Sequence, residues 1–193
     1  MTAENLDFEQ ALEALGELLE HRGHAFELVI AGGGALAMLG HIVRSTKDID
    51  IVALSRNGRF ESAKTLPPEL VRARDDVAAH LGLARDWLNS GPAELLDHGL
   101  PAGFEARMIT RRFGTLTVHL AGRFDQICFK FYAAVDRGPQ SKHVDDLRRL
   151  SPTSEELLVA ASWARGHDPS PEFLEMSRQA LGFFGVEESR AEG

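Results

Sequence analysis

The sequence has one cysteine, one tyrosine and two tryptophans among its 193 residues, and it has no long apolar run. Because Cys128 is the single cysteine, an internal disulfide is excluded, and we expect a buried thiol in a reducing compartment. No apolar run approaches the ~18 residues of a membrane-spanning helix, and the acidic start MTAENLDFEQ lacks the pattern of a signal peptide. The sequence therefore predicts a cytoplasmic protein that does not enter a membrane.

The chain also lacks net positive charge. Its formal net charge of −8 argues against a protein that holds nucleic acid with its whole surface. Residues 101–150 are the exception, because they carry nine Lys and Arg residues against five Asp and Glu residues. This segment predicts either a local anion-binding face or ordinary solvated charges on helices and a hairpin.

The spacing of apolar residues predicts an α+β fold, in which a small mixed sheet is flanked by helices and followed by a helical C-terminal part. Helical spacing occurs in residues 8–19, 35–39, 68–81, 124–135, 142–150, 154–165 and 171–184. Strands are predicted over residues 26–31, 49–53, 104–109 and 115–120, and the last two form either a hairpin or two adjacent strands. We expect residues 1–122 to form the core with its N-terminal helix, and residues 123–193 to pack on it as one compact unit.

Two aspartates, Asp48 and Asp50, lie on either side of one apolar residue at the start of a predicted strand. Residues i and i+2 of a strand point to the same face, so these carboxylates project together while Ile49 and Ile51 point to the core. Like charges this close repel each other unless a cation lies between them, and Mg²⁺ prefers hard oxygen ligands. We therefore predict a magnesium ion held by Asp48 and Asp50; an ion pair with an arginine is the simpler alternative.

Three consecutive glycines, Gly32, Gly33 and Gly34, follow the first predicted strand and open a helix. Glycines at such a turn expose backbone N–H groups, and the absence of side chains lets a phosphate approach closely. They are equally suited to a tight turn that needs positive φ. A triphosphate bridged by Mg²⁺ satisfies both the glycines and the aspartates, which is the arrangement that nucleotidyl transfer requires.

The stretch VIAGGGALAMLGHIVRSTKDIDIV resembles the signature of the polymerase-β-type nucleotidyltransferase superfamily. The AbiEii-like branch, with members that are toxins of type IV toxin–antitoxin pairs, is the closer match, because it reads roughly GG-x-AL and then R-x-T-x-D-I-D. Asp125 to Lys130 is similar to that branch's D-x4-K helix, and Lys142 to Leu147 is similar to its K-D-x-x-D-L segment. Trp87-Leu88-Asn89 also resembles an uncharacterised nucleotidyltransferase subfamily.

This resemblance implies a nucleotidyltransferase that uses ATP, CTP, GTP or UTP with one Mg²⁺ ion, or with two. It implies an RNA, such as a tRNA, or a protein as acceptor, and in several relatives a toxin that has an antitoxin partner. By position, the matched motifs assign nucleotide binding to Arg44, Thr46 and Lys130, in addition to the glycines. They add Lys130 and Asp146 to the two aspartates as catalytic residues, and Asp125 is a candidate further metal ligand.

Several alternatives stay open at these positions. Arg44 is equally suited to cap the end of a helix, Asp125 to form a helix N-cap, and Lys130 to be a surface lysine. Asp146 is preferred to Asp145 because it lies closer to the apolar side of its predicted helix.

Two residues depart from the family pattern. His143 stands where the branch often has Asp, and His119 stands where many relatives have a third carboxylate. The alternative function is therefore a nucleotide-binding module of the same fold with weak or no catalysis. A second alternative is a Rossmann-type dinucleotide binder, because the run from Gly32 to Ala37 also satisfies G-x-G-x-x-A.

Overall fold

The computed structural model describes residues 8–43 and 46–187. The chain divides into two compact units, residues 1–122 and residues 123–193. That the two units pack as one stays a prediction. Within the described residues, every helix is too short or too polar to cross a membrane.

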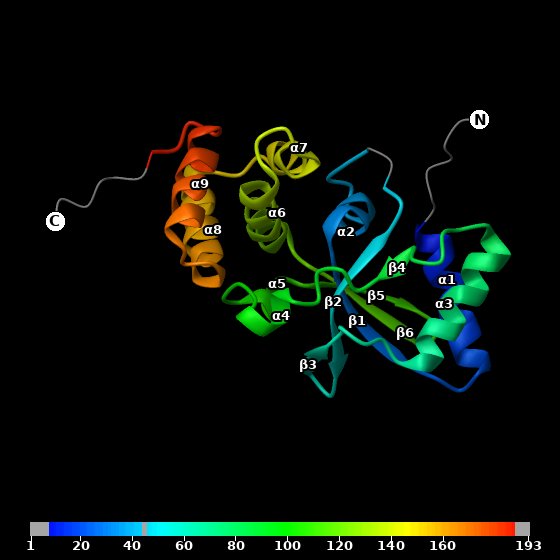
Figure 1. The fold of residues 1–193 in the computed structure, drawn as a ribbon. Coiled ribbons are helices and arrows are strands. Elements are labelled where there is room, and N and C mark those ends of the chain that lie inside the picture. The colour runs from blue at the N-terminus through cyan, green and yellow to red at the C-terminus, as the bar shows by residue number, and fades with distance from the viewer. Residues whose placement is uncertain (1–7, 44–45, 188–193) are drawn as a thin grey trace. The chain divides into compact units, whose positions relative to one another are not determined.

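The first unit is built around a six-stranded mixed sheet (Figure 1). The strand order is β3-β2-β1-β6-β5, and β4 pairs with β2 off this path. The strands are β1 (Phe26–Ala31), β2 (Ile49–Arg56), β3 (Arg59–Ser62), β4 (Leu88–Asn89), β5 (Ile109–Phe113) and β6 (Leu116–Leu120). The helices are α1 (Phe8–His21), α2 (Gly32–Met38), α3 (Pro68–Leu81), α4 (Leu95–His98) and α5 (Phe104–Arg107). The predicted α+β class is confirmed.

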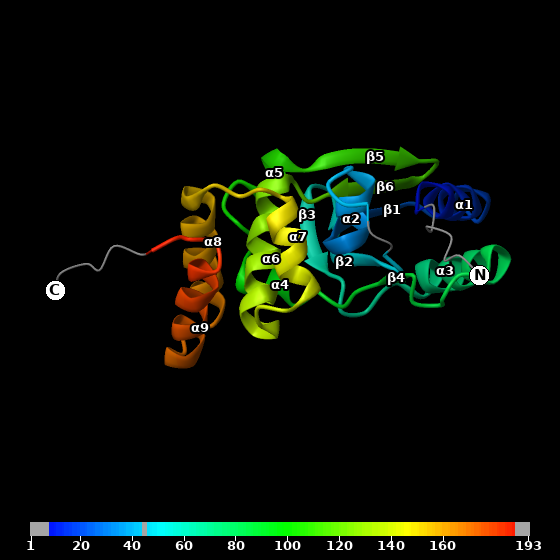
Figure 2. The same ribbon diagram turned by 90° about the horizontal axis from the view of Figure 1, so that it is seen from above.

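One face of this sheet carries the main apolar core of the first unit. The core residues of α1, among them Leu12 and Leu15, are fully buried and pack with Leu70 of α3 and with the sheet. Figure 2 shows α1 and α3 next to each other. The helical periodicity of residues 8–19 therefore reflects burial of one helix face, as predicted.

The first two strands of the chain run antiparallel, whereas β1 and β6 run parallel. A Rossmann unit needs two parallel strands joined by the helix that follows the glycines. The dinucleotide-binding alternative is therefore wrong for this chain, although its glycine spacing matches.

The predicted hairpin exists, but its first strand was placed too early. Residues 104–107 form helix α5, and β5 covers Ile109–Phe113. Arg111 and Arg112 lie between the two predicted strands in the sequence, and in the structure they belong to β5, the edge strand of the sheet. An edge strand accepts charged side chains because one of its sides is not paired.

The second unit consists of α6 (Arg123–Arg137), α7 (Lys142–Arg149), α8 (Ser154–His167) and α9 (Pro171–Gly182). Helix α8 begins at a capping box, in which Thr153 accepts from the backbone N–H of Glu156 and Glu156 accepts from that of Thr153. Tyr132 and Trp163 pack with other aromatic side chains between α6, α8 and α9. These four helices confirm the predicted helical C-terminal part.

Candidate active site

Asp48 and Asp50 lie where the chain enters β2. The strand begins at Ile49, so Asp48 immediately precedes it and Asp50 is its second residue. Ile49 and Ile51 are fully buried in the core, whereas both aspartates are half-buried. The alternation predicted from the sequence is thus present, and Asp50 lies on the sheet face opposite the main core.

The glycine turn packs directly against these residues. A Cβ atom added at Gly32 would lie 2.3 Å from Oδ2 of Asp50, and one added at Gly34 would lie 2.7 Å from the backbone oxygen of Asp48. Gly32 also has a φ of +76°, which other residues rarely adopt. The N-cap residue of α2 is Ala31, which has no side-chain oxygen to cap the first turn. The missing side chain at Gly32 therefore lets the Asp50 carboxylate lie directly against the glycine turn.

A comparison of Gly32→Ala with Gly40→Ala should separate two roles of Gly32: its close contact with the Asp50 carboxylate and its positive φ. Gly40 has a φ of +74°, but apart from its chain neighbours no atom of the described residues lies within 4 Å of an added Cβ. Both substitutions should cost about 1 kcal/mol of folding free energy because of positive φ. Only Gly32→Ala should also displace the Asp50 carboxylate and lower the transfer rate, by about 10- to 100-fold. Equal rates in the two variants, measured with purified proteins of matched melting temperature, would contradict this role of Gly32.

The structure adds a residue that the sequence analysis missed. Strand β4 pairs with the start of β2, and the register sets Asn89 beside Asp50. Paired residues of neighbouring strands point to the same face, and Asn89 is half-buried like Asp50. A two-residue strand is too short to show a period, so Leu88-Asn89 gave no strand signal.

Two other predicted nucleotide-binding residues, Arg44 and Thr46, precede β2 in the sequence. Arg44 lies outside the described residues. Thr46 is half-buried in the connection between α2 and β2 and belongs to no helix or strand. The structure therefore leaves both roles as predictions.

The basic segment of residues 101–150 spans the boundary between the two units. Several of its arginines make structural contacts: Arg111 bonds Glu9 and the Met38 carbonyl, and Arg123 bonds Glu156 and two carbonyls at the end of α7. An anion-binding face in this segment stays a prediction, and fewer of its cations are available than the sequence indicated.

Lys130 and Asp146 form an ion pair within the second unit. Lys130 Nζ lies 2.8 Å from Asp146 Oδ2, with 6% and 0% of the two side chains exposed. Asp146 lies on the buried side of α7 and Asp145 is exposed, as the helical spacing predicted, and Lys130 is not a surface lysine. Asp125 is also fully buried, and it lies in the first turn of α6 rather than at its cap. The catalytic, nucleotide-binding and metal roles of these residues stay predictions.

His143 lies one turn before Asp146 on α7, and its Nδ1 is buried without a hydrogen-bond partner in the described part of the chain. Burial lowers the pKa of His143 to about 4, with further lowering by Lys130 and Lys142 and an opposing effect of Asp146. The imidazole is therefore neutral at pH 7. A neutral side chain beside a buried ammonium avoids the repulsion that a second cation would add.

The His143 pKa predicts a loss of stability in mild acid. Above its ordinary pKa of 6.5 the imidazole is neutral in both states, but at lower pH the unfolded chain binds a proton that the folded chain does not bind. Stability should fall by about 1–2 kcal/mol between about pH 6.5 and pH 4, a value reduced because His143 is only half-buried. Urea unfolding of the wild type and His143→Asn at pH 7.5 and pH 5 measures this difference. The same gap between the two proteins at both pH values would contradict it.

The residues at the start of β2 fit a magnesium ion better than a metal held entirely by protein. Among residues 8–43 and 46–187, no group of three or more His, Cys, Asp or Glu side chains could hold a metal ion. Mg²⁺ needs fewer protein ligands, because one or two carboxylates commonly hold it together with water and substrate phosphates. Two aspartates at the start of β2, one of them with its carboxylate against the glycine turn, match that requirement.

The position where a third carboxylate was sought is occupied by a histidine with its own partners. His119 Nδ1 lies 2.8 Å from Thr110 Oγ1, and its Nε2 lies 3.5 Å from Glu27 Oε2. Ser55 Oγ donates to the same carboxylate at 3.0 Å. These residues form a polar network across the sheet face that also carries Asp50.

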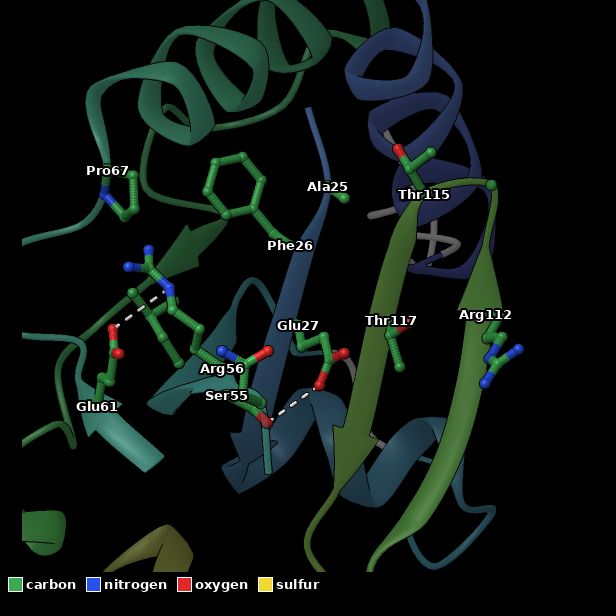
Figure 3. Close-up of a pocket in the computed structure, with 13 residues that line it drawn as sticks. Ala25, Phe26, Glu27, Ser55, Arg56, Glu61, Pro67, Arg112, Thr115 and Thr117 are labelled. Atoms are coloured by element: carbon green, nitrogen blue, oxygen red, sulfur yellow. Dashed lines mark hydrogen bonds and ion pairs between the residues drawn. The ribbon is translucent and has the colours of Figure 1, made fainter. Parts of the chain in front are cut away.

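A cavity lies beside this network, at the start of β1, whereas the glycine turn follows the end of that strand (Figure 3). It has a volume of about 400 Å³, and its lining includes Glu27, Ser55, Thr117 and Arg112. In Figure 3, Arg56 lies next to Glu61, with which it forms an exposed ion pair. The cavity carries charges of both signs and does not include the predicted active-site residues.

Comparison with known proteins identifies a family for this chain. No curated protein and no solved structure matches the chain. A family model described as "Nucleotidyltransferase of unknown function (DUF6036)" matches residues 7–140. That match covers more than half of the chain and includes the glycine turn, Asp48, Asp50 and Asn89. The chain therefore belongs to this nucleotidyltransferase family.

Proposed function

We propose that this protein is a Mg²⁺-dependent nucleotidyltransferase that moves a nucleoside monophosphate from an NTP to an RNA or protein acceptor and releases pyrophosphate. The contact between Gly32 and the Asp50 carboxylate is the observation that carries this proposal. It brings the glycine turn and the aspartate pair together at one place, as a metal-bridged triphosphate would require. Membership of a nucleotidyltransferase family supports the same chemistry.

In this proposal, Asp48 and Asp50 hold the magnesium ion, which neutralises phosphate charge when it is bound. Ile49 and Ile51 fix the backbone of these aspartates by burial in the core. The glycine turn orients the phosphate chain through backbone N–H groups and leaves room for it. Most of the catalytic effect then comes from positioning and charge neutralisation rather than from covalent chemistry by the protein.

Lys130 and Asp146 belong to the proposed machinery through the family resemblance of their motifs. Their buried ion pair holds the lysine ammonium in one position on α6. A lysine has a long, flexible side chain, and the ion pair with Asp146 restricts the positions that its ammonium group can take. On the same motifs we propose that the chain belongs to the AbiEii-like branch. If so, it acts as a toxin and has an antitoxin partner.

Incubation of the purified protein with each of the four α-³²P-labelled NTPs tests the activity. Each reaction contains Mg²⁺ and either total RNA or a protein extract, and a parallel set contains EDTA. Label should enter one acceptor fraction from one preferred NTP, only with Mg²⁺. Label transfer that is equal with EDTA, or absent with all four NTPs and both acceptors, would refute the proposal.

A second candidate is a nucleotide-binding module that does not catalyse transfer. The observation that favours it is His119, which has Thr110 and Glu27 as partners where a third carboxylate was expected. Mg²⁺-dependent NTP binding without any labelled acceptor would favour this module. Growth arrest on expression, relieved by a neighbouring gene, would instead favour the toxin.

A further inference from the structure

Strand β4 pairs with the first two residues of β2, on the edge of β2 that faces away from β1. One edge of β2 pairs with β1, so β3 and β4 share the other edge. Strand β3 pairs with Ala53–Arg56, whereas β4 pairs only with Ile49 and Asp50. The short strand β4 therefore adds a neighbour to the sheet just at the candidate active site.

This neighbour is firmly anchored. Trp87 is fully buried, its indole N–H donates to the Arg74 carbonyl at 3.3 Å, and its own carbonyl accepts from the Ile49 N–H at 2.6 Å. Leu88 is fully buried beside Ile49, and its carbonyl accepts from the Arg74 guanidinium. A polar side chain on such an element is held in a narrow range of positions, as substrate-binding groups require.

The amide of Asn89 is oriented by its own loop. Its Oδ1 accepts from the Gly91 backbone N–H at 2.8 Å, and its Nδ2 lies 3.4 Å from the Asp86 carbonyl. An amide group has two N–H donors, so one of them has no protein partner within the described residues. The amide oxygen of Asn89 is thus bonded within its own loop, and one N–H of its amide group remains for a ligand at the strand position beside Asp50.

We infer that Asn89 is a substrate-binding residue that donates its amide N–H to an oxygen of the bound nucleotide, next to the metal-holding carboxylate Asp50. This inference rests on the proposed function. Across the strands, Asp50 is flanked by β1, which ends at the glycine turn, and by Asn89 on β4. The glycine turn and Asn89 therefore approach a nucleotide from opposite sides of the same aspartate.

A structural role for Asn89 alone makes a different prediction from a substrate-binding role. If Asn89 only holds its own loop, Asn89→Asp keeps an acceptor for the Gly91 N–H and loses the 3.4 Å contact with the Asp86 carbonyl, so any effect should fall on the melting temperature and nucleotide binding should stay like that of the wild type. If it binds the nucleotide, Asn89→Asp loses the donor and places a negative charge near the phosphates. Asn89→Ala removes both functions, so the two variants together separate the roles.

Calorimetric titration with a non-hydrolysable α,β-methylene NTP and Mg²⁺ tests the inference. The NTP is the one preferred by the wild type, and melting temperature is measured for every protein. Asn89→Ala should raise the dissociation constant about five- to tenfold, as expected for one lost hydrogen bond, and Asn89→Asp should raise it at least as much.

The outcomes distinguish this inference from the proposed function. If the wild type does not bind the analogue, or binds it equally without Mg²⁺, the proposed function fails. If the wild type binds and Asp50→Asn weakens binding, but Asn89→Asp binds like the wild type, the inference on Asn89 is overturned alone. Tighter binding by Asn89→Asp also overturns it, because position 89 would then contact the metal rather than the nucleotide.

Discussion

Asp50→Ala is expected to slow nucleotide transfer by about 10²- to 10³-fold or more, which corresponds to a loss of about 3–5 kcal/mol of transition-state stabilisation. Asp48→Ala should have a similar effect. The carboxylate of Asp50 lies against Gly32, where we place the metal-bound phosphates. Removal of one of two carboxylates weakens the hold on a divalent cation and leaves the phosphate charge less neutralised. The measurement is the initial rate of label transfer at saturating NTP and Mg²⁺.

Asp50→Asn and Glu27→Gln provide the matched comparison. Both exchange a carboxylate for an amide of nearly equal size, and both residues lie on the same sheet face. Glu27 accepts from Ser55 at the other end of β1, away from the glycine turn. Asp50→Asn should lose activity like Asp50→Ala, whereas Glu27→Gln should stay within about twofold of the wild type. Unchanged rates in both Asp50 variants would mean that this aspartate does not hold the metal.

The fold elements with strong periodicity could be predicted from the sequence. Helix α1 buries one apolar face, which its helical spacing indicated, and β1 is a short apolar run that is buried on both faces from Leu28 to Ala31. The alternation of Asp48 and Asp50 with Ile49 and Ile51 follows from strand geometry. These local rules are sufficient because each depends on one segment alone.

Features that depend on contacts between distant segments could not be predicted in this way. Asn89 is a site neighbour only because β4 pairs with β2, and two residues carry no period. The separation of Lys130 and Asp146 by fifteen intervening positions gives no indication that they meet. Their ion pair arises from the packing of α6 against α7. Single residues of the site could be selected from the sequence, but the residues that contact them could be found only from the tertiary structure.

Asp146→Ala is expected to destabilise the second unit by about 3–5 kcal/mol, because it leaves the buried ammonium of Lys130 without its 2.8 Å partner. Lys130→Met should cost a similar amount by leaving a buried carboxylate. Trp163 is the single tryptophan of residues 123–193, so its fluorescence in a Trp87→Phe background reports urea unfolding of this unit. A change below about 1 kcal/mol in both variants would show that the pair is not desolvated in solution.

The double variant Lys130→Met with Asp146→Leu separates the structural role of the pair from its catalytic role. Both charges are then replaced by apolar side chains, and such replacements often restore or increase stability. We expect the double variant to unfold within about 1 kcal/mol of the wild type and yet to transfer label at least 100-fold more slowly. A stable double variant with normal activity would show that the ion pair serves the packing of α6 and α7 alone. A stable but inactive one would mean that the buried charges are retained for the reaction, since the helices do not need them to pack.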